Sequence, residues 1–594
     1  MSTHKEAAFK GGGFLVDDVQ PEHVFTPEDF TEEHKMIAKT TLDFVFQDVV
    51  PVKENIENHQ FDLSRKLLEK AGTLGLLGAD VPEKYNGLGL DKISSTIITE
   101  CFSPAGAFSL SYGAHVGIGS LPIVFFGNEK QRNKYLPDLA AGKKIAAYAL
   151  TEPSSGSDAL GAKTTAALND EGTHYVLNGE KQWITNSAFA DIFIVYAKID
   201  GEAFSAFIVE RTMNGVSTGP EEKKMGIKGS STRTLILEDV HVPKENLLGE
   251  AGRGHVIAFN ILNIGRYKLG AGCVGGAKRA IELASTYANQ RKQFQTPIGQ
   301  FRAIQEKLGT MAAKTYALES MIYRTGGLFE EKLGNLSAAE QNDGKQAAQS
   351  IAEFAIECSL TKVSGSETLD FVVDEAVQIH GGYGFMSEYE IETMYRDSRI
   401  NRIFEGTNEI NRLLVPGTIM RKAMKGELPL LEKAGKLQEE LVAFMPEEPG
   451  EGPLEKEKYL LKNAKKIFFF VAGHAAQKYG QSLENEQELL LKAADIVSDI
   501  YSMESVILRT EKAAGKNGTE KETVKHWLTN VYCQEAINRI EANAKEALVH
   551  MESGDTQRMM LSMLRKLLRH TPTNIVAIKR KIAEHILRQE RYSV

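Results

Sequence analysis

The spacing of apolar residues along the chain changes near residue 147 and again near residue 253. In the first part, FTPEDFTEEHKMIAKTTLDFVFQDV repeats apolar residues every three or four positions after Thr26 and Pro27. This spacing is typical of an amphipathic helix, and proline is common at the first turn of one. The pattern predicts an N-terminal helical domain over residues 27–147.

A period of two then replaces this spacing. YVLNGEKQWITNSAFADIFIVYAKI and RTLILEDVHVP alternate apolar and polar residues, and Asn-Gly pairs interrupt the alternation. Alternation is typical of half-buried strands, and Asn-Gly favours tight hairpin turns. The pattern predicts an antiparallel β domain over residues 148–252.

Long helical patterns return over residues 253–425, and the clearest is GHVIAFNILNIGRYKLGAGCVGGAKRAIELASTYANQRKQF. Several helices of this length predict a bundle. The cluster MPEEPGEGP at 445–453 predicts a linker, and helical patterns follow it. The expected fold is therefore α+β but mostly α. It has an N-terminal helical domain, a middle antiparallel β domain, a C-terminal helical bundle and an additional all-helical C-terminal domain over residues 426–594.

The composition is that of an ordinary globular protein. Hydrophobic residues make up 42% and charged residues 25% of the 594 residues, which disfavours disorder and predicts several domains. The net charge of −9 gives no reason to expect a nucleic acid partner. The four cysteines lie far apart, without CxxC pairs or histidines at ligand spacing. We therefore expect reduced thiols, with neither a disulfide nor a metal site.

No targeting pattern is evident at the start of the chain. MSTHKEAAFKGGGFLVDD has neither the apolar run of a secretory signal nor the arginine-rich pattern of an organelle presequence. The short apolar run IFFFVAG at 467–473 is far below the roughly 20 residues that a membrane-spanning helix needs. We expect a cytoplasmic protein.

Residues 270–275, GAGCVG, match the GxGxxG pattern of dinucleotide-binding turns. Such a turn needs a strand before it and opens a helix, whereas these glycines lie inside one long helical pattern. We therefore expect them to allow close helix packing.

Four other segments each allow a structural and a functional interpretation. YALTEPSSGSDALGAKT at 148–164 is either a polar loop or a loop whose N–H groups and hydroxyls bind a phosphate or a ring edge. WITN at 183–186 holds one of two tryptophans, which is either a core residue or a ring that stacks on a cofactor. RKQF at 291–294 closes a helix with two cations, and QIHGGYGF at 378–385 either ends a helix or lets a phosphate approach the backbone.

These segments, followed by YRDSRINRIFEGTNEI, occur in the order and spacing of the acyl-CoA dehydrogenase family, which the chain resembles from about residue 30 to 425. The extra helical block, together with EKKMGIKGSSTRTLILEDVHVPKENLLGE, is most similar to the very-long-chain branch. The resemblance implies an enzyme of fatty-acid β-oxidation that uses FAD to convert an acyl-CoA to its trans-2-enoyl-CoA. It implies an electron-transfer flavoprotein as the electron acceptor. The alternatives are an acyl-CoA oxidase that uses O2, and an assembly or binding protein that keeps the fold without turnover.

The stretch IFEGTNEINR places Glu405 between Phe404 and Gly406, where it resembles the catalytic base of the family. An apolar setting should raise the pKa of its carboxyl above about 4.3 and so improve it as a base. Some relatives hold the base on the long helix instead, but that position is Gly265 here and has no carboxylate.

The resemblance also implies which residues contact the substrate. Ser109 and Gly113, at the floor of the acyl pocket, are small, and each buried methylene contributes about 0.8 kcal/mol, so we expect a preference for long chains. The implied substrate contacts are Ser157, Asn263, Arg266, Phe404, Gly406, Ser109 and Gly113.

For FAD, the resemblance implies one set of residues near the flavin and a second set that reaches the FAD of a neighbouring subunit, which requires at least a homodimer. Arg302 stands in FRAIQ, where many relatives have glutamine. The first set is Tyr148, Leu150, Thr151, Ser157, Trp183, Ile184, Thr185, Thr407, Asn408 and Glu409, and the second is Arg291, Phe294, Gln378, Gly381 and Gly382.

Residues 556–594 are basic, with nine Lys or Arg against two acids. Met560, Met563, Leu564, Leu567 and Leu568 share one helical face there. This face either packs on the neighbouring domain or attaches the protein peripherally to a membrane, as the very-long-chain relatives suggest.

Overall fold

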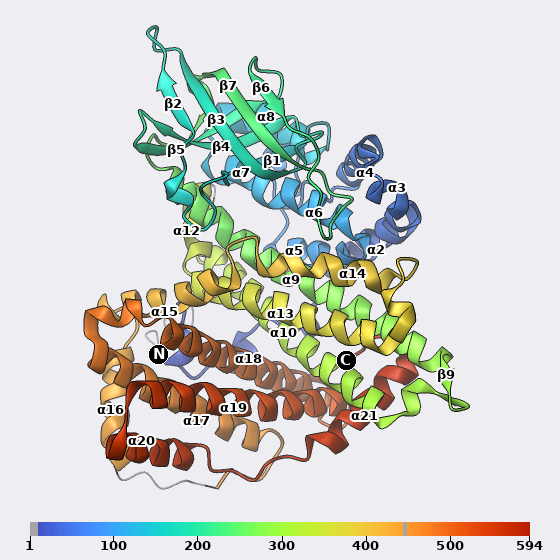
Figure 1. Ribbon diagram of the computed structural model, residues 1–594, viewed down its shortest axis with the longest axis vertical. Coiled ribbons are helices and arrows are strands. Elements are labelled where there is room, and N and C mark those ends of the chain that lie inside the picture. The colour runs from blue at the N-terminus through green and yellow to red at the C-terminus, as the bar shows by residue number, and fades with distance from the viewer. Residues whose placement is uncertain (1–9, 342, 443–447) are drawn as a thin grey trace.

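The computed structural model describes residues 10–341, 343–442 and 448–594, and it arranges them in tiers along one long axis. A β-sheet flanked by the first helices lies at one end, a helical bundle crosses the middle, and further helices form the other end (Figure 1). The predicted class, α+β and mostly helical, is confirmed.

The first tier begins after a short 3-10 turn at Pro27–Asp29. Among the described residues the first α-helix, α2, starts at Glu32, because the Thr31 hydroxyl accepts from the N–H of His34 and caps the helix there. The helices of this tier are α2 (Glu32–Phe44), α3 (Lys53–Glu57), α4 (Phe61–Thr73), α5 (Lys92–Cys101), α6 (Ala107–Gly113), α7 (Leu121–Phe126) and α8 (Glu129–Ala140).

One stretch within the described residues, Ala107–Phe126, is apolar and long enough to cross a membrane, with a mean hydropathy of 1.3. It comprises α6, the π-helical η8 (Ala114–Gly119) and α7. The sequence analysis considered only the shorter run at 467–473 and missed it. Since 78% of its apolar window is buried inside the protein, the stretch serves here as core.

The sheet runs in the order β6-β7-β3-β2-β4-β5-β8, with β1 paired to β4. Most pairs are antiparallel, as predicted, but β4 pairs in parallel with both β1 and β2. The strands are β1 (Ala146–Ala149), β2 (Thr165–Leu168), β3 (His174–Thr185), β4 (Ile192–Ile199), β5 (Ala203–Glu210), β6 (Val216–Thr218), β7 (Thr232–Pro243) and β8 (Leu247–Leu248).

The pair Asn178-Gly179 is not the hairpin turn that the sequence suggested. It lies inside β3, where the register with β7 shifts between Leu177 and Gly179. A Cβ at Gly179 would lie 2.5 Å from the hydroxyl oxygen of Thr164. The glycine therefore accommodates an irregularity in a continuous strand.

The middle tier is built around α9 and α13, which pack along one another. Gly270 of α9 allows this contact, as predicted, whereas a Cβ at Gly272 of the same motif would meet no atom within 4 Å. A Cβ at Gly270 would lie 2.8 Å from the Thr361 carbonyl oxygen, and one at Gly365 would lie 2.9 Å from the Cα of Gly270. The helices are α9 (Gly254–Gln290), α10 (Arg302–Gly334), α11 (Ala338–Gln341), α12 (Gly344–Ala352), α13 (Ala355–His380), α14 (Glu390–Ser398) and α15 (Asn408–Met424).

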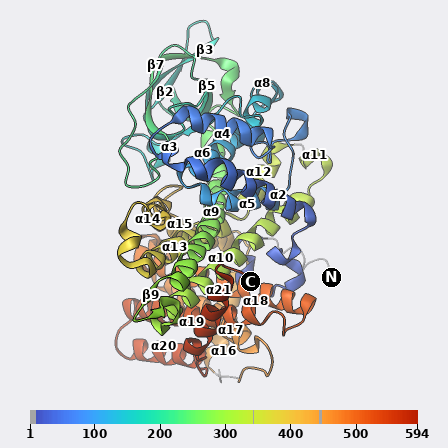
Figure 2. The ribbon, with the colours of Figure 1, turned by 90° about the vertical axis from the view of Figure 1, so that its right-hand side faces the viewer.

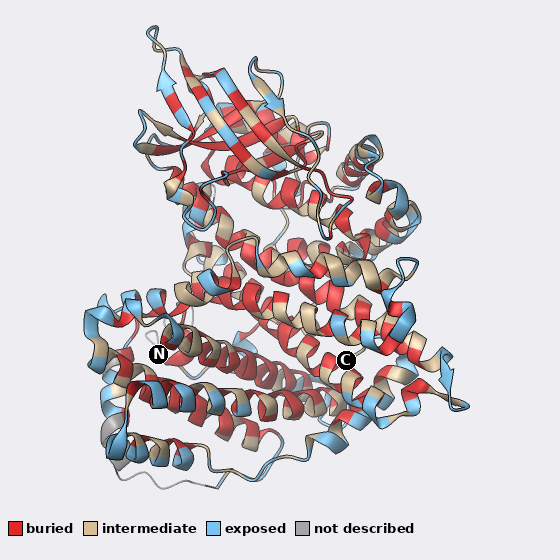
Figure 3. Cartoon of the chain, viewed as in Figure 1, coloured by how far each residue is buried: buried red, intermediate tan, exposed pale blue. Residues whose placement is uncertain are grey.

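The segment RKQF does not close α9, contrary to the sequence interpretation. The helix ends at Gln290, and a small hairpin of β9 (Lys292–Gln293) and β10 (Thr296–Pro297) follows it. Figure 3 shows this hairpin as an exposed projection, in contrast to the buried faces of the long helices.

The last tier comprises α16 (Leu430–Val442), α17 (Glu455–Tyr479), α18 (Gln487–Asn517), α19 (Thr523–Met551), α20 (Gly554–Leu567) and α21 (Ile575–Gln589). The predicted linker at 445–453 lies partly outside the described residues, and residues 448–453 form no helix or strand. The apolar face of α20 packs against α17 and α19, with Met560, Leu564 and Leu567 buried. This supports the packing interpretation, because the face is covered by protein and is not free to enter a membrane.

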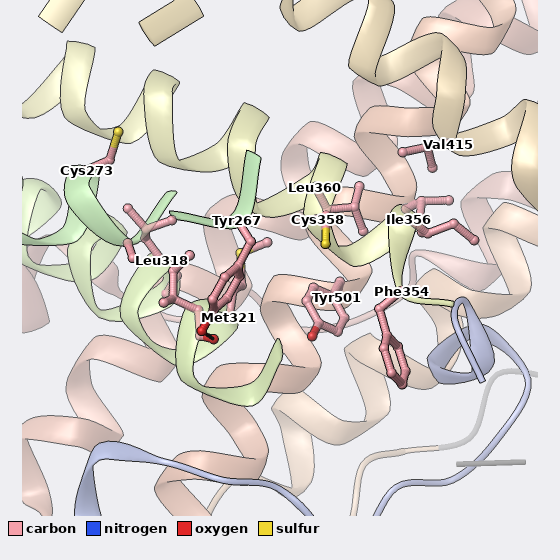
Figure 4. Packing of buried hydrophobic residues seen from close by; sticks show 14 of the residues in the cluster. Tyr267, Cys273, Leu318, Met321, Phe354, Ile356, Cys358, Leu360, Val415 and Tyr501 are labelled. Atoms are coloured by element: carbon pink, nitrogen blue, oxygen red, sulfur yellow. Dashed lines mark hydrogen bonds between the residues drawn. The ribbon is translucent and has the colours of Figure 1, made fainter. Parts of the chain in front are cut away.

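Both ends of the chain contact distant parts of the fold. The N-terminal segment lies against α18 (Figure 2), where the Phe14 and Tyr501 rings are 4.7 Å apart and Arg509 binds Glu28 at 3.0 Å. The hydroxyl of Tyr592, beyond α21, donates to Glu319 of α10 at 2.8 Å. The extra helices share one core with the bundle, as Figure 4 shows for Tyr501 beside Phe354 and Cys358.

The contact between α9 and α13 predicts the effect of a single methyl group. Gly270→Ala is expected to destabilise the protein by about 1–3 kcal/mol, because the methyl overlaps the backbone of α13. Gly515→Ala is the matched control, since a Cβ at this helical position meets no atom within 4 Å. It should stabilise by about 0.5–1 kcal/mol. Equal effects in chemical denaturation would contradict the close contact.

Candidate active site

A cavity of about 250 Å³ lies between the first helices, α9 and the turn before α15. Ser109 and Gly113 line it from α6, Gly272 lines it from α9, and Phe404 and Glu405 line it from the turn. A Cβ at Gly113 or Gly272 would meet no atom within 4 Å, so both glycines border open space. The cavity is a mainly apolar slot with the Glu405 carboxyl on its wall.

Glu405 enters the cavity from a turn with left-handed backbone, with φ of 57° at Glu405 and 78° at Gly406. A non-glycine residue adopts this conformation only where its surroundings hold it. Arg266 Nε donates to the Glu405 carbonyl at 3.3 Å, Lys362 Nζ donates to the Gly406 carbonyl at 2.8 Å, and the Asn411 amide donates to both carbonyls. The turn is therefore fixed by bonds from three separate helices.

The carboxyl of Glu405 is placed against a glycine. Its Oε2 is buried and has no hydrogen-bond partner among the described residues. A Cβ at Gly265 would lie 2.7 Å from this oxygen, so a side chain at that position would displace the carboxyl. Burial raises the pKa of Glu405 to about 7, although the cations Arg266 and Lys362 oppose the shift. This is the direction expected from the sequence, and it produces a proton acceptor matched to neutral pH.

Four models of known domains match successive parts of the chain. They are the acyl-CoA dehydrogenase N-terminal domain at 31–143, the middle domain at 147–240, and two C-terminal domains at 252–419 and 463–566. A "Probable acyl-CoA dehydrogenase" of Bacillus subtilis is 68% identical and covers 98% of each chain. The chain belongs to the acyl-CoA dehydrogenase family.

Two more relatives place the chain within this family. The human "Very long-chain specific acyl-CoA dehydrogenase, mitochondrial" is 33% identical over 92% of this chain and 84% of its own length. The predicted similarity to the branch with an additional helical domain is thereby confirmed. A crystal structure of an acyl-CoA dehydrogenase complexed with FAD, from Bacillus anthracis, superposes with a TM-score of 0.97 at 70% identity, over 98% of this chain and all of the other.

The end of β3 reaches the cavity of this acyl-CoA dehydrogenase. Thr185 lines the cavity together with Glu405. Trp183 is not a core residue, since 59% of its surface is exposed and its φ is 59°, whereas Ile184 beside it is buried. Tyr148 is partly buried, and its hydroxyl has no hydrogen-bond partner of normal geometry among the described residues. The end of β3 therefore combines an exposed aromatic ring with a threonine that lines the cavity of Glu405.

The loop after β1 is held to β3 through its backbone carbonyls. Lys181 Nζ donates to the Leu150 carbonyl at 3.2 Å, and the N–H of Gln182 donates to the Thr151 carbonyl at 2.8 Å. Ser157, further along the loop, is exposed. On the substrate side, Asn263 is buried and accepts from Arg266 at 3.0 Å. Asn263 thus supports the arginine that holds the Glu405 turn.

The second set of residues lies at the opposite end of α9. Arg291, Gly381 and Gly382 border another hollow, of about 520 Å³, and Phe294 is 90% exposed. Gln378 is exposed near them. Since Gly265 and Gln290 are 25 residues apart in one helix, the two ends are separated by about 37 Å. This set cannot contact the Glu405 site of the same chain.

The side chains of Asn408 and Arg302 are bonded within the chain. Asn408 is 2% exposed, and its amide binds Lys362, Ser366 and Glu367, so its side chain is not free to face a cofactor. Arg302 donates to Gln305 at 2.7 Å and lies 3.5 Å from Glu584 of α21. Of their neighbours, Thr407 caps α15 by accepting from the N–H of Ile410, and Glu409 is exposed.

The sequence analysis did not identify Lys362 and Asn411, which hold the turn of Glu405. Both are fully buried. A lysine on a helix face among apolar residues, as in SLTKVSGSETL, is the one local signal that could have drawn attention to Lys362. Nothing in the sequence near Asn411 indicates that its amide caps a left-handed turn.

The raised pKa of Glu405 predicts how stability depends on pH. The folded-state pKa of about 7 lies above the ordinary value of 4.5, so the unfolded state ionises first and ionisation favours unfolding over this interval. Glu405→Gln removes this cost. The resulting increase in the free energy of unfolding should be absent below about pH 4, grow toward neutral pH and level off above about pH 7 at about 3 kcal/mol. Calorimetry at several pH values measures it, and a gain that does not change with pH would contradict the burial of the charge.

Proposed function

We propose that this acyl-CoA dehydrogenase oxidises long-chain acyl-CoA to trans-2-enoyl-CoA in fatty-acid β-oxidation. The observation that supports this most is the buried, unpartnered carboxyl of Glu405, with a pKa of about 7, on the wall of an apolar slot. An acyl chain in this slot would present its Cα to the carboxyl.

Removal of the α-proton is the difficult step, because a thioester is a weak carbon acid. Glu405 accepts the proton, and the negative charge that develops on the thioester oxygen requires fixed hydrogen-bond donors. The N–H of Glu405 itself is one such donor, since its turn is held by Arg266 and Lys362. Phe404 packs beside the thioester, and Gly406 leaves room for it.

The residues of β1 and of the end of β3 fit FAD, which would supply the acceptor for the hydride that leaves Cβ. The exposed ring of Trp183, the unpaired hydroxyl of Tyr148 and the hydroxyl of Thr185 suit a flavin face and edge. The distant set at the end of α9 suits the FAD of a second subunit, because Phe294 projects into solvent and side chains at Gly381 and Gly382 would meet nothing within 4 Å. The proposal therefore includes FAD and a homodimer.

An electron-transfer flavoprotein is the proposed electron acceptor, and the cytoplasm is the proposed location. The covered apolar face of α20 argues against peripheral membrane contact through this helix. An oxidase would instead reduce O2, so hydrogen peroxide formed under air at the rate of turnover would replace this part of the proposal.

The role of Glu405 is tested by Glu405→Gln. We expect this variant to purify yellow, with flavin bound, and to lose bleaching by palmitoyl-CoA by at least about 1,000-fold, because an amide cannot accept the proton. Glu357→Gln is the matched control. Glu357 is another buried carboxyl with a pKa of about 7, but it binds the N–H of Gly12 and does not line the cavity. Wild-type bleaching by Glu405→Gln in stopped-flow measurements would refute the assignment.

The chain-length preference is tested at the floor of the slot. Gly113→Leu should lower kcat/KM for C16 substrates by at least about 10-fold relative to C8, since each methylene excluded costs about 0.8 kcal/mol. Gly334→Leu, at a helical glycine with no atom within 4 Å but outside the slot, is the control. A wild-type maximum at C4, or an unchanged profile in Gly113→Leu, would contradict the long-chain proposal.

A further inference from the structure

Lys362 of α13 is a buried cation that contacts the peptide next to Glu405. Its ammonium donates to the Gly406 carbonyl at 2.8 Å and to the Asn408 side-chain oxygen at 2.7 Å. Lys362 has no exposed surface. Burying an ammonium costs free energy unless its hydrogen bonds are satisfied. The two bonds of Lys362 therefore fix the turn that carries Glu405 to α13.

The bonds continue from Lys362 toward the extra helical domain. The Asn408 amide donates to Glu367 at 3.0 Å. Arg412 binds both carboxylate oxygens of Glu367, at 2.8 and 2.9 Å, and its Nε binds Asp495 of α18 at 2.7 Å. One chain of hydrogen bonds thus joins Asp495, outside the catalytic bundle, to the peptide next to Glu405.

Two further contacts keep α18 in register with α13. The hydroxyls of Ser364 and Ser498 are 2.9 Å apart. Tyr501 packs among residues of α13, as Figure 4 shows beside Cys358 and Leu360. Asp495 is therefore carried on a helix whose position relative to the bundle is fixed, as a positioning element must be.

We propose that Lys362 is a positioning residue for Glu405, and that the extra helical domain takes part in this function through Asp495. The inference rests on the proposed role of Glu405 as the base. Lys362 holds the left-handed turn through the Gly406 carbonyl, and Asp495 orients Arg412, which orients Glu367 and Asn408 around the ammonium. The additional domain thereby acts on the active site without touching the substrate.

The ammonium also sets the charge around the carboxyl. The charged or titratable groups that face Glu405 are Arg266 from α9, Lys362 from α13 and Tyr148 from β1. Arg266 and Lys362 stabilise the carboxylate and hold its pKa lower than burial alone would set it. Loss of either cation must therefore raise the pKa of Glu405, which a merely structural residue would not do.

The experiment compares Lys362→Met with Lys362→Arg in the flavin-containing protein. The pKa of Glu405 is read from its carboxyl infrared band, identified by its loss in Glu405→Gln, and from the pH profile of kcat. We expect Lys362→Met to raise this pKa by about one unit and to lower kcat at pH 7 by about 10-fold or more. Lys362→Arg keeps the cation and should keep the pKa near the wild-type value.

The role of the extra domain is tested by Asp495→Asn against Asp499→Asn. Asp499 lies one turn further along α18 and pairs with Arg539 of the same domain, not with Arg412. We expect Asp495→Asn to lower kcat about three-fold or more and to shift the Glu405 band, and Asp499→Asn to leave both unchanged. Flavin content and Tm, measured for every variant, identify any protein that has failed to fold.

The inference is overturned if Lys362→Met keeps the pKa of Glu405 within about 0.2 units, and its kcat within two-fold, of the wild-type values. If Lys362→Met does not fold, equal behaviour of Asp495→Asn and Asp499→Asn decides against it. Turnover by Glu405→Gln would refute the proposed function instead, and the infrared band would still report whether Lys362 controls Glu405.

Discussion

A carboxylate without a partner must be kept inside an apolar slot, and this constraint governs the structure around it. Burial alone opposes the charged form, so the site needs nearby cations, but a direct salt bridge would remove the basicity that the proposed reaction uses. The protein meets both needs by placing Arg266 and Lys362 on the backbone of the Glu405 turn and not on its carboxyl. Gly265 then leaves the space that the free oxygen occupies.

The close contact between α9 and α13 also shapes the site. The same approach that brings Gly270 against Gly365 brings Lys362 of α13 and Arg266 of α9 to two successive carbonyls of one turn. Packing and catalysis are thus not separable here. The extra helices belong to the same unit, since α18 contributes Tyr501 to the core of the bundle and Asp495 to its polar network.

The sequence was most informative where a pattern repeats or where a residue type has one physical use. Helical and strand periods predicted the fold class. Because no strand precedes the glycines of α9, they were assigned to helix packing, which holds for Gly270 but not for Gly272, a residue that lines the cavity. Local turn chemistry misled at Asn178-Gly179, where pairing with β7 extends the strand through a pair that favours a hairpin in isolation. The helix end at RKQF was also misplaced, because the hairpin after Gln290 is held by its own pairing.

The candidate site was predictable in part for a similar reason. Glu405 and the small residues of the slot were found from a resemblance that rests on contiguous motifs. Lys362, Asn411 and Asp495 meet only in three dimensions, through contacts between residues that are far apart in the sequence. The inward direction of the Asn408 amide was not predictable for the same reason, because its partners lie on another helix.

The contacts made by the two ends of the chain have a consequence for biosynthesis. Glu28 pairs with Arg509, and Glu319 accepts a hydrogen bond from Tyr592, so each contact joins residues that are far apart in the sequence. The first tier can begin to form as it leaves the ribosome, but the contacts that join the tiers require helices that are synthesised several hundred residues later. Nascent chains that stall or terminate early therefore keep unsatisfied charges and open core surface, which are the features that chaperones and proteases recognise.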